Sequence, residues 1–421
     1  MTSSAPQTGF LTANAHALAT ILEASQTKSI IASRDIFDVS GIKLWARDQP
    51  VSQALQRKLL DRQLRHPMES CLVAENGVTG RSLLQSVEAL VDGSSPLSPL
   101  LRPHADEIIH AAMHLPLHPV AQLLLTAGQV SRPESFDHAV QAMALCGAMM
   151  VGQGGGTREL RTAMICGLLH DLGEMYIAPE FGEADTERAI DVQSYQHLVV
   201  HPHVGKLLVD QLTNYPAEVA RAIAEHHERL DGSGYPHCLQ GPQVSPLGRL
   251  LAVAEGTLAA LRAEHGHLMR ASVALRAVPG EFDMHWAGAV AHAARQQPPL
   301  QATLSVDEIG QRLSRLGFAL DDAQAHVAAL LPKATTPALK DALALSQHLL
   351  MRLRMGWNAS GLWSRESLTD GDSAEVEAIE NELLLRLHGI QRAARLRAGD
   401  LPEEDATRLN VLCLGLVQGL G

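Results

Sequence analysis

The stretch that most constrains the fold of this chain runs from His226 to Pro236 and reads HHERLDGSGYP. It follows an apolar, helix-like run, Ala217–Glu225. Adjacent helical residues point about 100° apart, so two histidines in a row rarely fill one apolar slot but can hold two neighbouring metal ions. Glycines after a helix allow positive φ and close approach of a ligand to the backbone. An ordinary capped helix with a routine turn is the alternative, and the density of special residues disfavours it.

Further imidazole and carboxylate groups lie at the ends or on the faces of other helix-like segments. Glu134 and His138 are four residues apart, so they share one face of a predicted helix. Such groups are ligands for divalent iron, manganese or zinc, and helical proteins build metal centres by directing them into one core. The candidate metal ligands are Glu134, His138, His170, Asp171, His201, His226, His227 and Glu255.

An upstream histidine, a His-Asp pair, His-Pro-x-x-Gly and the His-His-Glu…Gly-Tyr-Pro stretch together resemble the HD-GYP domain, a branch of the HD phosphohydrolases. The resemblance covers about residues 130–290. It implies an all-helical domain that holds two or three divalent metal ions, most often iron or manganese, and hydrolyses the bacterial messenger cyclic di-GMP. It carries the ligand role to His138, His170, Asp171, His201, His226 and His227. Glu255 would complete one coordination sphere, and Glu134 matches the extra ligand of three-metal members.

The resemblance also implies roles in the reaction. Asp171 is the natural bridging ligand, because a carboxylate has two oxygens, and a metal pair roughly 3.5–4 Å apart would activate the attacking water. Asp171 and Glu174 are the predicted catalytic residues. The predicted substrate-binding residues are Arg229, Asp231, Gly232, Gly234, Tyr235 and Pro236.

Three departures from the family pattern favour a different function. Glu174 stands where the family usually has lysine, Glu255 stands where it usually has aspartate, and residues 264–267 are acidic and histidine-rich where basic residues are expected. The competing hypothesis is therefore a metal-stabilised receptor or interaction module that binds a nucleotide or a protein without turnover. An HD hydrolase acting on another phosphate ester is a third reading.

Composition narrows the class of protein. Of 421 residues, 46% are hydrophobic but only 3% are aromatic, which predicts a core of Leu, Ala, Val and Met and favours helices. A net charge of −12 argues against a nucleic-acid binder, which needs a basic face. Five scattered cysteines predict a reduced, cytoplasmic protein. We find neither a signal peptide nor an apolar run near the ~20 residues that span a bilayer.

The predicted fold class is mainly α, in three parts. Residues 1–128 are predicted to hold a small α+β unit followed by helices at 81–92 and about 105–128. The metal-dependent phosphohydrolase domain is predicted at 129–297. In the first part, strands are expected at 29–37, 42–45 and 71–73, with a helix from residue 50 to about 65.

Residues 298–421 are predicted to form a bundle of four or five helices. This region packs against the domain, dimerises or transmits a signal, so a homodimer or protein partner is expected. The glycine-rich Gly152–Gly156 lacks the ending of a phosphate-binding loop and is predicted to join two helices. The basic residues Arg57, Lys58, Arg62 and Arg65 are predicted to form a solvated helix face, with a partner contact as the alternative.

Overall fold

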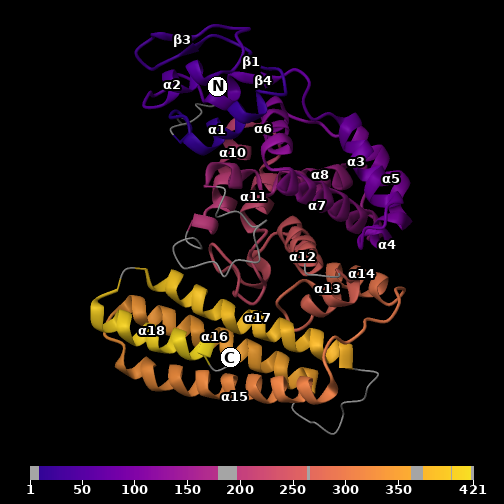
Figure 1. Ribbon diagram of the computed structural model, residues 1–421, viewed down its shortest axis with the longest axis vertical. Helices are drawn as coiled ribbons and strands as arrows, with labels where there is room; N and C mark the ends of the chain where they lie inside the picture. Colours follow the sequence, from indigo (N-terminus) through magenta and orange to yellow (C-terminus); the bar gives the residue numbers. More distant parts are fainter. Residues whose placement is uncertain (1–8, 179–196, 263–265, 362–372, 400, 419–421) are drawn as a thin grey trace.

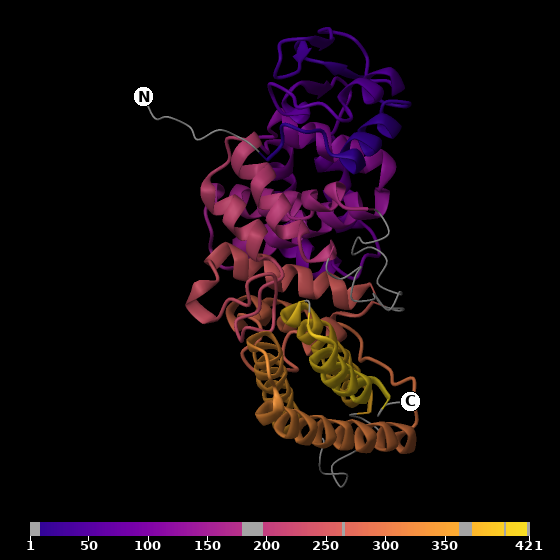
Figure 2. The same ribbon diagram turned by 90° about the vertical axis from the view of Figure 1, so that its left-hand side faces the viewer.

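The computed structural model describes residues 9–178, 197–262, 266–361, 373–399 and 401–418. The protein is mainly helical, as predicted, with three layers stacked along its long axis (Figures 1 and 2). A small α+β unit lies at one end, the metal-site helices lie in the middle, and long C-terminal helices form the other end.

The α+β unit confirms the predicted mixture of short strands and helices. Its helices are α1 (Ala15–Ala24) and α2 (Gln53–Leu59). Its strands, β1 (Ile30–Ala32), β2 (Ile36–Phe37), β3 (Lys43–Trp45) and β4 (Leu72–Ala74), pair as two antiparallel two-stranded sheets, β1 with β4 and β2 with β3. The prediction that α2 reaches residue 65 is wrong. The chain turns after Leu59, and Asp61 has a positive φ of 68°, which no helix accommodates.

The next segment contains α3 (Gly80–Asp92), α4 (Ser98–Leu101), α5 (Ala105–Met113) and α6 (Pro119–Ser131). The prediction of a single helix at 105–128 is wrong, because this segment forms two helices, α5 and α6. Pro116 lies between them and Pro119 begins α6, and a proline disfavours helical backbone at the residue before it. The ring of His118 then caps α6 by accepting from Val120 N at 3.2 Å.

The middle layer holds α7 (Pro133–Gly152), α8 (Thr157–Leu169), the 3₁₀ helix η3 (Leu172–Tyr176), α10 (His201–Leu212), α11 (Ala217–Glu225), α12 (Pro246–Leu261), α13 (Leu268–Ala274) and α14 (Met284–Ala294). Gly152–Gly156 joins α7 to α8, as predicted. One hydrophobic core runs from the α+β unit through α14, so these two layers fold against each other.

The C-terminal bundle has its own core and comprises α15 (Val306–Leu330), α16 (Pro337–Ser360), α17 (Ser373–Ala398) and α18 (Glu403–Gln418). Helix α15 is continuous over 25 residues, because no proline interrupts it. Trp357 lies buried in α16, whereas Trp363 lies outside the described residues. The bundle docks closely on the middle layer: a side chain at Gly356 would collide with the carbonyl of Ala277.

No described helix has the length and apolar character needed to cross a membrane. All five cysteines carry free thiols, and four of them are buried. The three-part division of the chain stays a prediction, because the α+β unit and the middle layer share one core.

Candidate metal centre

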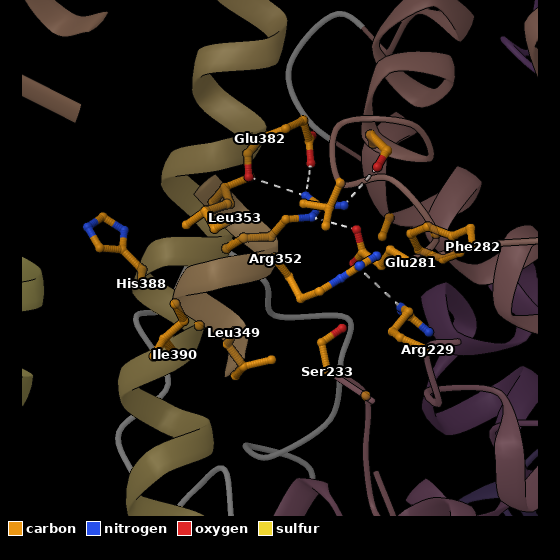
Figure 3. Close-up of a pocket in the computed structure, with 18 of the residues that line it drawn as sticks. Arg229, Ser233, Glu281, Phe282, Leu349, Arg352, Leu353, Glu382, His388 and Ile390 are labelled. Atoms are coloured by element: carbon orange, nitrogen blue, oxygen red, sulfur yellow. Dashed lines mark hydrogen bonds and ion pairs between the residues drawn. The ribbon is translucent and has the colours of Figure 1, made fainter. Parts of the chain in front are cut away.

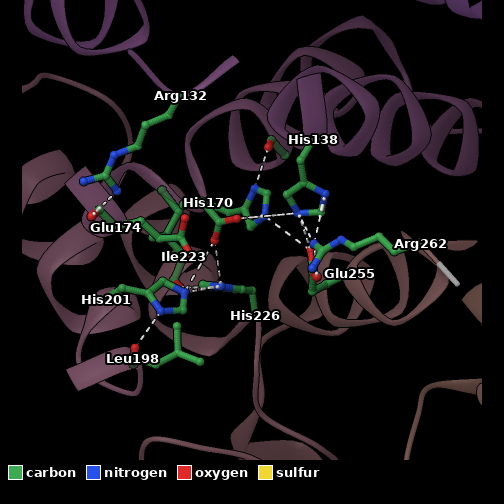
Figure 4. Close-up of polar contacts among 12 residues, drawn as sticks. Arg132, His138, His170, Glu174, Leu198, His201, Ile223, His226, Glu255 and Arg262 are labelled. Atoms are coloured by element: carbon green, nitrogen blue, oxygen red, sulfur yellow. Dashed lines mark hydrogen bonds and ion pairs between the residues drawn. The ribbon is translucent and has the colours of Figure 1, made fainter. Parts of the chain in front are cut away.

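The ends of several helices of the middle layer deliver imidazoles and acids to one buried point (Figure 4). His138 comes from α7, and His170 and Asp171 follow α8. His201 opens α10, while His226 and His227 follow α11. Two groups of potential ligand atoms, each within 4.8 Å of one another, share Asp171: an inner half of Asp171, His201, His226 and His227, and an outer half of His138, His170 and Asp171.

A glycine brings the inner half together. Gly173 follows Asp171 in the sequence, and a Cβ at this position would collide with the carbonyl oxygen of His201. Only glycine therefore lets η3 lie directly against the start of α10, which places the carboxylate of Asp171 beside the ring of His201.

Three of the histidines are oriented in the same way. In each, Nδ1 donates to the backbone carbonyl three residues earlier, which leaves Nε2 directed into the centre. The pairs are His170 with Gly167 at 2.7 Å, His201 with Leu198 at 2.7 Å, and His226 with Ile223 at 2.6 Å. Since a carbonyl can only accept, each of these rings, when neutral, presents a lone pair to the centre, as metal-binding histidines do.

The inner half gathers ring nitrogens around one carboxylate oxygen. The Nε2 atoms of His201 and His226 lie 3.1 Å apart, and Asp171 Oδ1 lies 3.4 Å from each. Burial, reinforced by His227, lowers the pKa of His226 to about 3, so its ring stays neutral. Asp171 Oδ1 is buried and accepts no hydrogen bond within the described residues. Lone pairs and a bare carboxylate oxygen facing one another fit a divalent cation.

The outer half already contains positive charge. Glu255 Oε2 lies 2.8 Å from His138 Nε2, and Asp171 Oδ2 lies 3.0 Å from His170 Nε2. Burial would lower the pKa of His170, but Asp171 and Glu255 outweigh it and raise that pKa well above its usual value. In the absence of metal, a proton on His170 therefore balances the two carboxylates.

An arginine adds a second positive charge here. Arg262 Nη2 lies 3.1 Å from both Glu255 Oε1 and His138 Nε2. Burial alone would raise the pKa of Glu255, but His138 and Arg262 bring it well below its usual value. Sequence analysis missed Arg262. Its signal was its spacing, because seven residues after Glu255 is two helical turns along the same face of α12.

The Gly-Tyr-Pro loop packs directly behind the inner half. The ring of Tyr235 stacks on His227, with centroids 4.5 Å apart and planes at 18°. A Cβ at Gly234 would collide with the carbonyl of His227, so glycine is required for this close packing. Gly232 has a φ of 83°, and the bond before Pro236 is cis.

The charged residues Glu228 and Arg229 make contacts that hold the loop in place. Glu228 accepts from the backbone N–H groups of His237 and Leu239 at 2.7 and 2.8 Å. Arg229 lies over the ring of Phe282, 4.6 Å from its centroid, and 4.0 Å from Glu281. The predicted role of Arg229 in binding substrate stays a prediction.

Asp231 is held by the C-terminal bundle as well as by its own loop. Its Oδ1 accepts from Ser233 N at 3.0 Å. On the other side, its carbonyl lies 2.7 Å from His348 Nε2 and its Oδ2 lies 3.4 Å from Arg352 Nε, both on α16. Nothing in the local sequence indicated these two residues, which lie more than a hundred positions away.

Three residues predicted to act at the metal centre belong to neither group of ligand atoms. Glu255 is one of them, although its Oε2 lies 2.8 Å from His138 Nε2. Glu134 is exposed on α7 and belongs to neither group of ligand atoms. Glu174 is buried in η3, where its carbonyl accepts from Arg132 Nη1 at 2.8 Å, and it too belongs to neither group. The third-metal role of Glu134 and the catalytic role of Glu174 stay predictions.

Comparison with known proteins relates part of this chain to a protein family. Residues 127–279 match the family described as HD domain. The chain is 27% identical to a cyclic di-GMP phosphodiesterase of Pseudomonas aeruginosa, over 49% of this chain and 47% of that protein. It is 25% identical to a 3′3′-cGAMP-specific phosphodiesterase of Vibrio cholerae, over 32% and 31%. It is 34% identical to a cyclic di-GMP phosphodiesterase response regulator of Xanthomonas campestris, over 23% and 25%.

The matched region spans less than half of the length of each of these relatives. No solved structure matches the chain significantly. The region that carries the histidines and Asp171 is therefore an HD domain. Over this region the chain is similar to proteins named as cyclic di-GMP and 3′3′-cGAMP phosphodiesterases.

Proposed function

We propose that this protein is a metal-dependent phosphodiesterase that hydrolyses a cyclic dinucleotide, with cyclic di-GMP as the leading substrate. The observation that carries the proposal is the shared position of Asp171 between two groups of ligand atoms, with one oxygen directed to each. Relatives named as phosphodiesterases of cyclic di-GMP and of 3′3′-cGAMP support the substrate class.

The donor set would hold divalent ions such as iron or manganese, and Asp171 contributes to both groups of ligand atoms. Bound there, such ions supply an activated water and neutralise the phosphoryl oxygens. The protein's part is to fix the ligands. The carbonyl partners of His170, His201 and His226 hold the rings, and Tyr235 covers His227. Arg262 adds a cation at the outer edge, where an anionic substrate would approach.

The test is hydrolysis by protein purified without oxygen and loaded with iron or manganese. Metal per chain is counted by elemental analysis, and cyclic di-GMP and 3′3′-cGAMP are assayed in parallel for linear product. His201→Ala is expected to abolish turnover. His203→Ala is the matched control, because His203 lies on the same helix but is exposed. Fully loaded protein that yields no product from either nucleotide would contradict the proposal.

A binding module without turnover is the second candidate. It is favoured by Arg262, which already neutralises part of the outer half, and by the acidic Glu174. Calorimetric binding of cyclic di-GMP by fully metal-loaded protein, without product, would select it. The homodimer or protein partner stays a prediction, which a mass measurement in solution would test.

A further inference from the structure

The middle layer and the C-terminal bundle enclose a cavity of about 690 Å³ between them (Figure 3). One end is lined by His227, Ser233 and Tyr235 of the motif segment, and the opposite wall by α16 and α17. This volume lies within the roughly 300–1,000 Å³ of small-molecule sites. The cavity therefore begins at a candidate metal ligand and ends on helices that lie outside the HD domain.

The bundle wall is both apolar and rigid. Leu349 and Leu353 of α16 and Ile390 of α17 line it, opposite Phe282. Ion pairs fix the wall to the middle layer. Arg386 of α17 donates to Glu281 Oε2 at 2.8 Å and to the carbonyl of Ala274 at 2.7 Å. His348 and Arg352 of α16 also contact Asp231. Together these contacts make the wall a preformed surface.

The lining of the cavity has an excess of positive residues, although the chain carries a net charge of −12. Its lining holds five arginines and three carboxylates: Arg229, Arg270, Arg352, Arg386 and Arg392 against Asp231, Glu281 and Glu382. In addition, Nε of Arg270 is buried and has no hydrogen-bond partner within the described residues. A buried donor without an acceptor costs free energy, and an acceptor on a bound ligand would remove that cost.

We propose that this cavity binds the distal nucleotide of the substrate, so that α16, α17 and Arg270 determine which dinucleotide is accepted. This rests on the proposed function. A dinucleotide has one phosphate for the metal centre and a second phosphate and base beyond it. The apolar wall suits the flat face of a base, and Arg270 suits the oxygens of a phosphate or base. A small phosphodiester has nothing that reaches the bundle.

A glycine offers a clean test. Gly389 of α17 lines the cavity, and no atom lies within 4 Å of a Cβ built there. Gly389→Phe should therefore add a ring to the cavity with no collision at its Cβ, and phenylalanine is a better helix former than glycine. Gly389→Ala controls for helix propensity. Gly310→Phe is the matched control, because Gly310 of α15 has equally open space but does not line the cavity.

The readout is KM and kcat for a cyclic dinucleotide and for bis(4-nitrophenyl) phosphate, with metal per chain measured. Gly389→Phe is expected to raise KM for the dinucleotide at least ~10-fold, since a good hydrogen bond and stacked base are lost, and to leave the small ester unchanged. Arg270→Gln should raise the dinucleotide KM ~10-fold in the same selective way. Equal loss on both esters, or no loss on either, overturns the proposal.

Binding of the linear dinucleotide, measured by calorimetry, separates this inference from the proposed function. If the wild type hydrolyses neither ester, the proposed function fails. The cavity inference is then upheld if Gly389→Phe loses this binding while Gly310→Phe keeps it. It is overturned if the wild type does not bind the linear dinucleotide, or if both variants bind it equally.

Discussion

The two halves of the metal centre are built from similar residues but differ in charge. The inner half gathers three imidazoles, that of His226 being neutral, around an oxygen of Asp171 that accepts no hydrogen bond within the described residues. The outer half brings its own positive charge, from a proton on His170 and from Arg262. The difference teaches that the same types of ligand can differ in metal affinity, because the affinity depends on which positive charges the fold already places beside them.

The largest effect is expected when both halves are broken together. Asp171→Asn removes the charge that they share, so metal should be lost from both and turnover should fall on the order of 10³-fold, equivalent to several kcal/mol of transition-state stabilisation. Elemental analysis and the hydrolysis assay measure this. Asp137→Asn is the control, because Asp137 is exposed on α7. Full metal content in Asp171→Asn would refute the bridging role.

Removing one histidine from each half should show that the halves differ. His226→Ala should empty the inner half, whereas His138→Ala should leave it filled, because His138 is not among the inner ligand atoms. Metal per chain under limiting manganese distinguishes the two variants. Equal loss of metal in both variants would mean that the two halves bind metal only together, which would contradict a difference between them.

Arg262→Gln should make the metal affinity of the outer half more like that of the inner half. The guanidinium competes with a metal ion for Glu255 and His138, and a charge-assisted contact is worth about 1.5–3 kcal/mol. Its removal should tighten metal binding at the outer half by ~10-fold or more, as measured by titration against a chelator. Arg262→Lys keeps the charge and should bind metal like the wild type. Unchanged affinity in Arg262→Gln would show that the arginine does not compete.

The smallest effect is expected far from both halves. Burial raises the pKa of Glu69 above the ordinary 4.5, although a 2.5 Å hydrogen bond from Tyr176 opposes this. The folded protein therefore binds this proton more tightly, and the stability it contributes is complete below pH 4.5 and is lost as the pH rises through the folded pKa.

Glu69→Gln should match the wild type at low pH and melt about 2 °C or more higher near neutrality, corresponding to roughly 1 kcal/mol. Thermal melts across pH measure this, with metal content as the reference, since both halves should fill as in the wild type. A wild type whose melting temperature rises relative to Glu69→Gln with increasing pH would contradict the assigned direction.

The sequence by itself determined the fold class and the residues of the centre. A core of Leu, Ala, Val and Met favours helices, and the placement of His170, His201 and His226 at helix ends is local information that the spacing of apolar residues carries. The HHERLDGSGYP segment likewise indicated a tight loop next to His227, because glycine permits the positive φ and close backbone approach that other residues rarely allow.

Only the tertiary structure decided how charge is distributed and what covers the site. Glu134 shares a helix face with His138, yet it is exposed, since the path of α7 past the centre depends on its neighbours. Arg262 reaches His138, 124 residues away, and α16 reaches the Gly-Tyr-Pro loop from 117 residues away. Contacts at such separations leave no local period in a sequence, because long-range packing of helices, rather than propensity within any one of them, brings the groups together.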